Sequence, residues 1–182
     1  MGRFFFSKSA AFARFLALLL LASLIVFFNG CAGYHIGPIQ PTPMRGVKTI
    51  AVGTFKNATL IPRIEVLITD TVIRQIQQDG TYQIAPEDKA DAVLTGEIER
   101  VRRSPSRSVV GNVIATAEFT MDLTIHYTVR RRDNGLVVQN TSATGQTNFF
   151  VSGDVNQDER QAIPLAAQDA AVRLVSQISE GW

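Results

Sequence analysis

Residues 113–132 read VIATAEFTMDLTIHYTVRRR, and this stretch decides the class of fold. Apolar and polar side chains alternate here, which is the pattern of a β-strand with one face in a core and one in water. The apolar positions are Ala117, Phe119, Met121, Leu123, Ile125 and Tyr127. The polar positions are Glu118, Thr120, Asp122, Thr124, His126 and Thr128. We therefore predict a long amphipathic strand over 113–132.

Further strands are expected on both sides of this one. Asp133-Asn134-Gly135 is typical of a hairpin turn, so residues 136–151 should return as an antiparallel strand. Residues 90–104 should form the preceding strand and reach residue 113 through a loop over 104–112. Shorter strands are predicted at 47–55 and 81–85.

A first helix is predicted over 63–79, where Ile, Leu and Val recur at helical spacing. Asp79-Gly80 should end it, because glycine adopts the backbone conformation that closes helices. Asn57 and Thr59 are the candidate capping residues at its start.

A second helix is predicted near the end of the chain, where an Ala-rich apolar stripe runs from Ile163 to Ile178. Asn156 and Glu159 have the spacing of a capping box. Pro164 should either kink this helix or mark its true start.

This order of elements predicts an α+β fold, a two-layer sandwich. We expect two helices packed on one face of a mostly antiparallel four-stranded sheet. The domain should span 47–182, a length sufficient for one core. Residues 31–46 contain several Pro and Gly residues and are expected to form a tether.

The first thirty residues have the pattern of a secretory signal peptide. Arg3, Lys8 and Arg14 precede the uncharged run FLALLLLASLIVFF over 15–28, which is short for a membrane span. An uncleaved membrane anchor is the alternative. The chain has 18 Lys and Arg and 16 Asp and Glu. Without residues 1–30 the basic residues number 15, so net charge does not favour nucleic-acid binding.

Catalytic residues, a metal and a cofactor are not expected. His35 and His126 have no Cys or His companion at metal-ligand spacing. The chain contains no P-loop, GxGxxG or GxSxG motif. We therefore expect a protein that is not an enzyme.

Arginines are concentrated near the two turns of the predicted hairpins and are candidate phosphate ligands, because the guanidinium matches phosphate geometry. The seven candidates are Arg100, Arg102, Arg103, Arg107, Arg130, Arg131 and Arg132. The alternative is that they only keep the hairpin ends soluble. Neighbouring strand residues point to opposite faces, and the two groups fall at opposite ends of one hairpin, so a single patch is not expected.

Cys31 is the only cysteine of the chain and directly follows the signal-like segment. Its position after Gly30 resembles the lipobox of bacterial lipoproteins. The resemblance implies cleavage before Cys31 and lipidation of its thiol and new amine, which would hold the chain at a membrane surface. Ala32 in place of Asp resembles an outer-membrane address.

Four segments in order resemble the LptE family of outer-membrane lipoproteins. They are CAGYHI at 31–36, TIAVGTFKNATLIPRIEVLITDTVIRQI at 49–76, DAVLTGEIERV at 91–101 and AEFTMDLTIHYTV at 117–129. The Ala-rich final helix fits the same order. The resemblance implies a two-helix, four-stranded sandwich and a non-enzymatic role. The partner would be an LptD-like β-barrel, which the chain would help to assemble and would plug from the periplasmic side of the outer membrane.

Lipopolysaccharide would be the second partner implied by the family, and its phosphates make the seven arginines candidate contacts. The block at 49–59 also resembles lipoproteins that activate peptidoglycan synthases and lipoproteins of curli secretion. A periplasm-facing synthase activator is therefore the main alternative. An enzyme and a structural lipoprotein without such a partner are the remaining alternatives.

Overall fold

The computed structural model describes residues 41–107, 118–151 and 154–181. Three long strands form most of the sheet: β4 (Ala92–Arg107), β5 (Glu118–Arg131) and β6 (Val137–Phe150). They pair antiparallel in that order. Every second side chain of β5 from Met121 to Val129 is fully buried, so the predicted alternation is confirmed there. The expected strand residues 113–117 lie outside the described part.

The sheet has six strands and is mixed, whereas we expected four strands in a mostly antiparallel sheet. β1 (Thr49–Val52) lies parallel to β4 and to β3 (Gln83–Ile84). β2 (Lys56–Asn57) lies parallel to β4 beyond the end of β1. The sheet order is β3-β1-β4-β5-β6, with β2 attached to β4. The predicted strands at 47–55 and 81–85 correspond to β1 and β3, whereas β2 was not expected because two residues are too few to show alternation.

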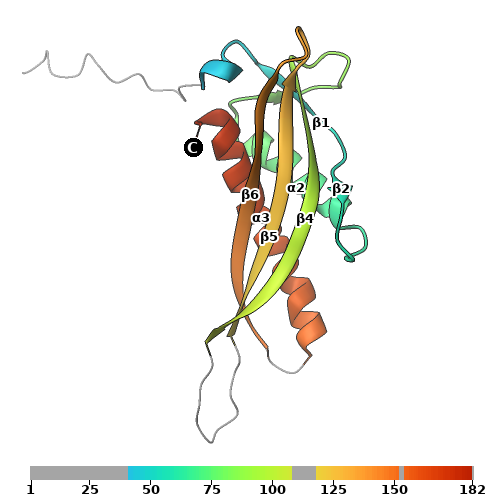
Figure 1. Cartoon of the computed structure of the whole chain (residues 1–182), viewed down its shortest axis with the longest axis vertical. Helices are drawn as coiled ribbons and strands as arrows, with labels where there is room; N and C mark the ends of the chain where they lie inside the picture. Colours follow the sequence, from blue (N-terminus) through green and yellow to red (C-terminus); the bar gives the residue numbers. More distant parts are fainter. Residues whose placement is uncertain (1–40, 108–117, 152–153, 182) are drawn as a thin grey trace, which may run out of the picture. The chain divides into compact units, whose positions relative to one another are not determined.

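Two helices cover one face of this sheet, α2 (Ile64–Asp79) and α3 (Val155–Ser179), as Figure 1 shows. Because α2 lies between β1 and β3 in the chain, these two strands are able to run parallel. The apolar stripe of α3 is buried from Ala162 to Ile178, as its spacing predicts. The predicted α+β class is therefore confirmed, although the strand arrangement is not.

The start of α2 differs from our expectation. Arg63 precedes the helix with a φ of 64° and makes no side-chain cap. Asn57 and Thr59 instead bond to each other, since Asn57 Oδ1 accepts the Thr59 N–H at 2.9 Å and its hydroxyl at 2.8 Å. The end agrees with the prediction, because Gly80 takes a φ of 76° and its N–H bonds to Ile76 O at 3.1 Å.

The start of α3 also differs from our expectation. Asp154 caps the helix, and its Oδ1 accepts the N–H groups of Asn156 and Gln157. The predicted capping box of Asn156 and Glu159 is therefore wrong. The helix runs through Pro164 to Ser179, so Pro164 does not mark its start.

Helix α3 lies directly on β6 at Gly145. A Cβ atom at Gly145 would lie 2.1 Å from Ala166 O and 2.2 Å from Ala170 N, which are backbone atoms of the helix. Only glycine therefore permits this approach at this position. The alanines of α3 serve the same purpose from the other side, since Ala166 and Ala170 are completely buried.

Candidate functional site

The helix-free face of β5 and β6 carries eight Thr, Asn, Ser and His side chains that bond across the strands, and Glu118 and Asp122 lie on the same face of β5. The four pairs are Thr120 Oγ1 with Asn148 Oδ1 at 2.9 Å, Thr124 with Thr144 at 3.2 Å between hydroxyls, His126 Nδ1 with Ser142 Oγ at 3.1 Å, and Thr128 Oγ1 with Asn140 Oδ1 at 3.1 Å. We call these eight residues the polar face. Such cross-strand pairs stabilise a sheet while leaving a surface that water or a polar wall is able to contact.

A β-bulge in β4 decides where the first group of arginines points. Pairing with β5 shifts between Ile98 and Arg100, and beyond the bulge Val101 pairs with the buried Leu123. Arg100 and Arg102 consequently stand opposite Thr124 and Asp122, on the helix-free side of the sheet. The prediction that these two arginines share a face is confirmed, and both are exposed.

Arg103 points to the other face, toward α3. Its Nη1 lies 3.0 Å from Glu159 Oε2, and its guanidinium carbon lies 5.3 Å from the ring centroid of Phe119. Phe119 in turn stacks on Phe149 with 5.9 Å between centroids. This arginine therefore joins β4 to the first turns of α3. Arg107 ends β4, and its side chain lies outside the described part.

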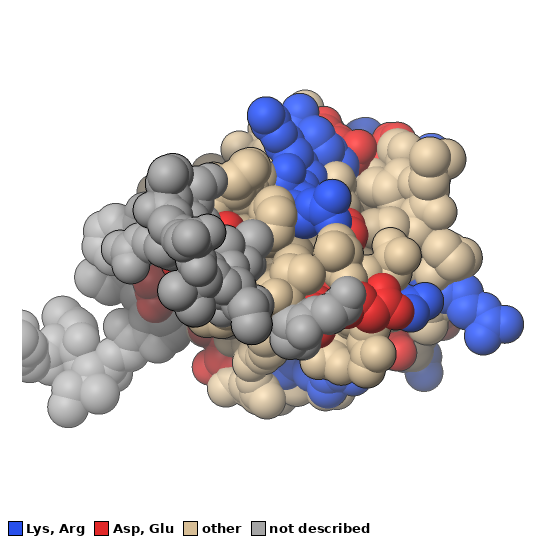
Figure 2. All heavy atoms as spheres, turned by 90° about the horizontal axis from the view of Figure 1, so that it is seen from below, with Lys and Arg blue, Asp and Glu red and all other residues tan. Residues whose placement is uncertain are grey.

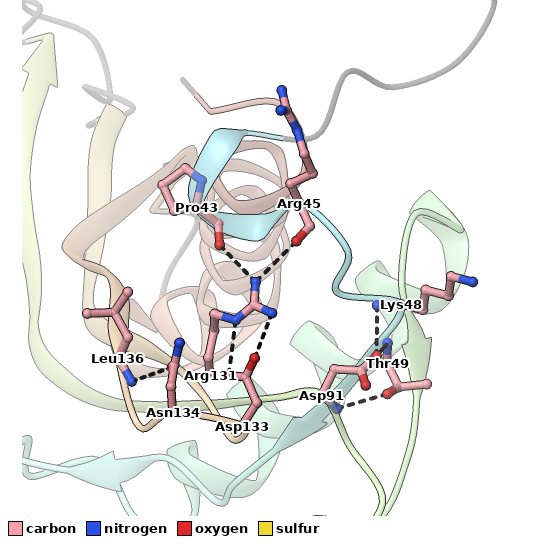
Figure 3. A network of polar contacts seen from close by, with 9 residues as sticks. All are labelled: Pro43, Arg45, Lys48, Thr49, Asp91, Arg131, Asp133, Asn134 and Leu136. Carbon is pink, nitrogen blue, oxygen red and sulfur yellow. Dashed lines mark hydrogen bonds and ion pairs between the residues drawn. The ribbon is translucent and has the colours of Figure 1, made fainter.

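The second group of arginines is engaged at the β5–β6 turn, as Figure 3 shows for Arg131. Arg131 Nη1 donates to Arg45 O at 3.1 Å, and Arg131 Nη2 lies 3.0 Å from Asp133 Oδ2. Arg130 donates to Gly135 O at 2.9 Å, and Arg132 donates to Asp88 O. These side chains hold the turn, and Arg131 also holds the 3-10 helix η1 (Thr42–Met44), which lies in the part that we expected to be a tether. The buried Met44 anchors η1 in the core.

Asp91 completes the polar contacts at this end of the sheet (Figure 3). Its Oδ2 accepts the backbone N–H groups of Lys48 and Thr49, each at 2.9 Å. These two hydrogen bonds lower the pKa of the Asp91 carboxyl, and the nearby Arg131 lowers it further. The contact joins the start of β1 to the start of β4. The pKa of Asp133 is also lowered, chiefly by its hydrogen bond from Arg131.

The two groups of arginines lie at opposite ends of the β4–β5 hairpin, as predicted. Arg131 pairs with Ala92, ten residues from Arg102 along β4, which corresponds to about 33 Å of strand. Figure 2 shows the Lys and Arg side chains of one end in separate groups, with acidic and neutral residues between them. Among the described candidates, only Arg100 and Arg102 have exposed side chains with neither an ion pair nor a hydrogen bond.

Several expectations fall outside the described residues, among them the signal peptide, the lipidation of Cys31 and the tether up to residue 40. Within the described ranges, no group of His, Cys, Asp or Glu is placed to hold a metal ion. No helix of residues 41–107, 118–151 and 154–181 is long and apolar enough to cross a membrane.

One feature that our reading of the sequence missed is the composition of β6. The fourteen residues Val137–Phe150 contain no charged residue and no proline, although β6 is an edge strand of the sheet. The run VVQNTSATGQTNFF shows this directly. This composition is unusual only because β6 lies at an edge of the sheet, and the periodicity of the sequence does not reveal the order of the strands.

The family model of LptE, described as lipopolysaccharide-assembly, matches residues 47–178. The chain belongs to the LptE family. No curated protein matches it. The family comprises non-enzymatic lipoproteins of lipopolysaccharide assembly, and the matched residues include both helices almost entirely and all six strands.

Solved structures resemble this LptE-family chain at low sequence identity. A putative neuraminyllactose-binding hemagglutinin homolog from Helicobacter pylori has 12% identity and a TM-score of 0.52, with 80% of this chain and 89% of that chain covered. A minor lipoprotein from Acinetobacter baumannii has 14% identity and a TM-score of 0.48, with 73% and 93% covered. The first likeness shows a common fold.

Proposed function

We propose that this LptE-family chain is lipidated at Cys31 and anchored in the outer membrane, facing the periplasm. There it assembles with an LptD-type β-barrel, occupies the barrel lumen as a plug and takes part in the transport of lipopolysaccharide to the cell surface. The observation that carries this proposal is the family match over residues 47–178. That match includes the three long strands and both helices.

The chemistry of the polar face supports insertion into a barrel. Lumen walls of transmembrane β-barrels are polar, whereas their outer walls are apolar. The threonine, asparagine and serine side chains of this face exchange hydrogen bonds with such a wall without themselves burying a charge. The two helices remain on the opposite side of the sheet.

Arg100 and Arg102 are the candidates for direct contact with lipopolysaccharide. Both stand on the helix-free side of β4, within reach of the polar face. Lipid A and the inner core carry phosphates, which guanidinium groups bind with paired hydrogen bonds. The other described candidates make contacts within the chain. Arg103 contacts Glu159, Arg130 contacts Gly135 O, Arg131 contacts Arg45 O, and Arg132 contacts Asp88 O.

The proposal is tested by affinity purification of the full tagged chain from detergent-solubilised outer membrane, followed by mass spectrometry. We expect a large LptD-like barrel in near-equal amount. The Cys31→Ser variant, which lacks the lipidated thiol, should be lost from the outer-membrane fraction and recover less barrel. Recovery of a peptidoglycan synthase without a barrel would overturn the proposal and favour the synthase activator.

A further inference from the structure

Strand β6 leaves a long edge of the sheet open. It ends the strand order β3-β1-β4-β5-β6, so in the described part of the chain no strand pairs with its outer side (Figure 1). Natural edge strands usually carry lysine, proline or an inward charge that discourages pairing. β6 has none of these residues over Val137–Phe150. Its edge is therefore suited to accept another strand.

One hydrogen bond identifies which backbone groups face this edge. Gln146 N–H points away from β5 and donates to Asp169 Oδ2 of α3 at 2.8 Å. Backbone groups of a strand alternate between its two sides, so Asn140, Ser142 and Thr144 also direct their N–H and C=O groups to the edge. Asp169 covers the edge at Gln146. The open part is consequently 140–144, about 17 Å long.

Helix α3 provides an apolar flank beside the same edge. Leu165 and Val172 lie four residues before and three residues after Asp169, so the three side chains share one side of the helix. Leu165 is 55% exposed and Val172 is 39% exposed, although both are large and apolar. Gln177 meets Gln139 and Asp169 meets Gln146, so α3 runs antiparallel to β6 and Val172 is the one that lies toward residues 140–144. Asp169 itself pairs with Arg173 at 3.0 Å, which leaves the flank without net charge.

The position of α3 decides what is able to occupy this edge. The helix lies directly over β6, with its backbone against Gly145. If a second copy paired edge to edge, its own α3 would lie about 5 Å from this one, the distance between neighbouring strands. Two packed helices need about 8–10 Å between axes. A second copy therefore clashes, whereas a single extended segment without a covering helix does not.

We propose that residues 140–144 of β6, together with Val172 of α3, bind an extended segment of a partner protein as an added strand. The segment has uncharged polar side chains on the side that continues the polar face. It has small apolar side chains on the side that meets Val172. A charged segment is disfavoured, because the edge offers no opposite charge to compensate desolvation. The proposal does not rest on the barrel partnership, since any partner with such a segment satisfies it.

The test uses the full chain in detergent micelles and a fluorescein-labelled peptide of seven alternating Thr and Val residues, with two C-terminal lysines for solubility. We expect saturable binding by fluorescence anisotropy. Hydrogen exchange at Asn140, Ser142 and Thr144 should slow when the peptide is bound. Ser142→Pro removes one outward N–H and should weaken binding by about tenfold.

Two matched controls separate edge pairing from other effects. Ser142→Ala loses the same hydrogen bond to His126 but keeps the N–H, so its affinity should stay within about twofold. Val172→Arg should weaken binding, whereas Val66→Arg, at a 53% exposed valine of α2, should not. Absence of binding to the wild-type chain, or equal binding by all four variants, would overturn the proposal. A dimer in sedimentation that Ser142→Pro dissociates would also overturn it, because the occupant would then be a second copy.

Discussion

At the scale of single residues, Asp91 illustrates how an exposed carboxylate acquires a structural role. It belongs to the segment DAVLTGEIERV, where nothing distinguishes it from any aspartate before a strand. Its partners are the N–H groups of Lys48 and Thr49, more than forty residues earlier in the chain. Charged acceptors form stronger hydrogen bonds than neutral ones, so the strength of this interaction depends on ionisation.

The Asp91→Asn variant should therefore lose stability in a pH-dependent way. The folded chain lowers the pKa of Asp91 below its ordinary value of 3.8, so the carboxylate stabilises the fold at neutral pH. That contribution is lost as the pH falls below about 4 and through the lowered value. The difference in free energy of unfolding between wild type and variant, measured in urea, should be largest at pH 7 and shrink toward pH 3. A difference that does not change with pH would contradict this role.

The roles of the arginines were predictable only in part. Their alternation on a strand correctly placed Arg100 with Arg102 and separated the two ends of the hairpin. The engagement of Arg131 was not predictable, because its acceptor Arg45 O lies 86 residues away in the chain. Hydrogen bonds of that range depend on how η1 returns to the β5–β6 turn, which no local pattern specifies.

At the scale of elements, long strands were easier to predict than short ones. Six alternating apolar positions indicate β5, whereas β2 consists of two residues and shows no period. β3 also has two residues and was expected only as part of a longer strand over 81–85. The bulge in β4 did leave a signal. Ile98 is buried and Val101 is partly buried on the same face, and an odd spacing of three residues requires one extra residue between them.

The close packing of α3 on β6 makes Gly145→Ala the most disruptive small substitution that we predict. The added methyl group would overlap the backbone at Ala166 and Ala170, which side-chain rotation does not relieve. Overpacking of this kind costs about 3 kcal/mol of unfolding free energy, because the helix must move away from the sheet. Chemical denaturation measures the decrease in stability.

A matched control for this substitution is Gly53→Ala. There the added methyl group would meet Thr95 Cγ2 at 3.4 Å and Leu94 O at 3.6 Å, near ordinary van der Waals distance. We expect a decrease in stability below about 1 kcal/mol. Equal decreases at the two glycines would contradict the close approach of α3 to β6.

At the scale of the whole molecule, the proposed lipopolysaccharide contacts lie at one end of the β4–β5 hairpin, at Arg100 and Arg102. The double variant Arg100→Gln, Arg102→Gln should weaken binding to purified lipopolysaccharide by about tenfold for each charge-assisted hydrogen bond that it removes. The comparison variant Arg130→Gln, Arg132→Gln changes two arginines that already bond to Gly135 O and Asp88 O. It should alter the unfolding midpoint more than the affinity.

Surface plasmon resonance with immobilised lipopolysaccharide measures both double variants. An equal decrease of affinity in the two would indicate attraction by total charge and would contradict local binding at Arg100 and Arg102. Unchanged affinity in both would remove these arginines from lipopolysaccharide binding altogether.

The uncharged hydroxyl and amide pairs of the polar face have a practical consequence for any complex formed on them. Hydrogen bonds between uncharged threonine, asparagine and serine are hardly screened by dissolved ions, whereas exposed ionic interactions weaken as ionic strength rises. A partner docked on this face should therefore remain bound through a wash in about 1 M sodium chloride. A ligand held by Arg100 and Arg102 should be released by the same wash.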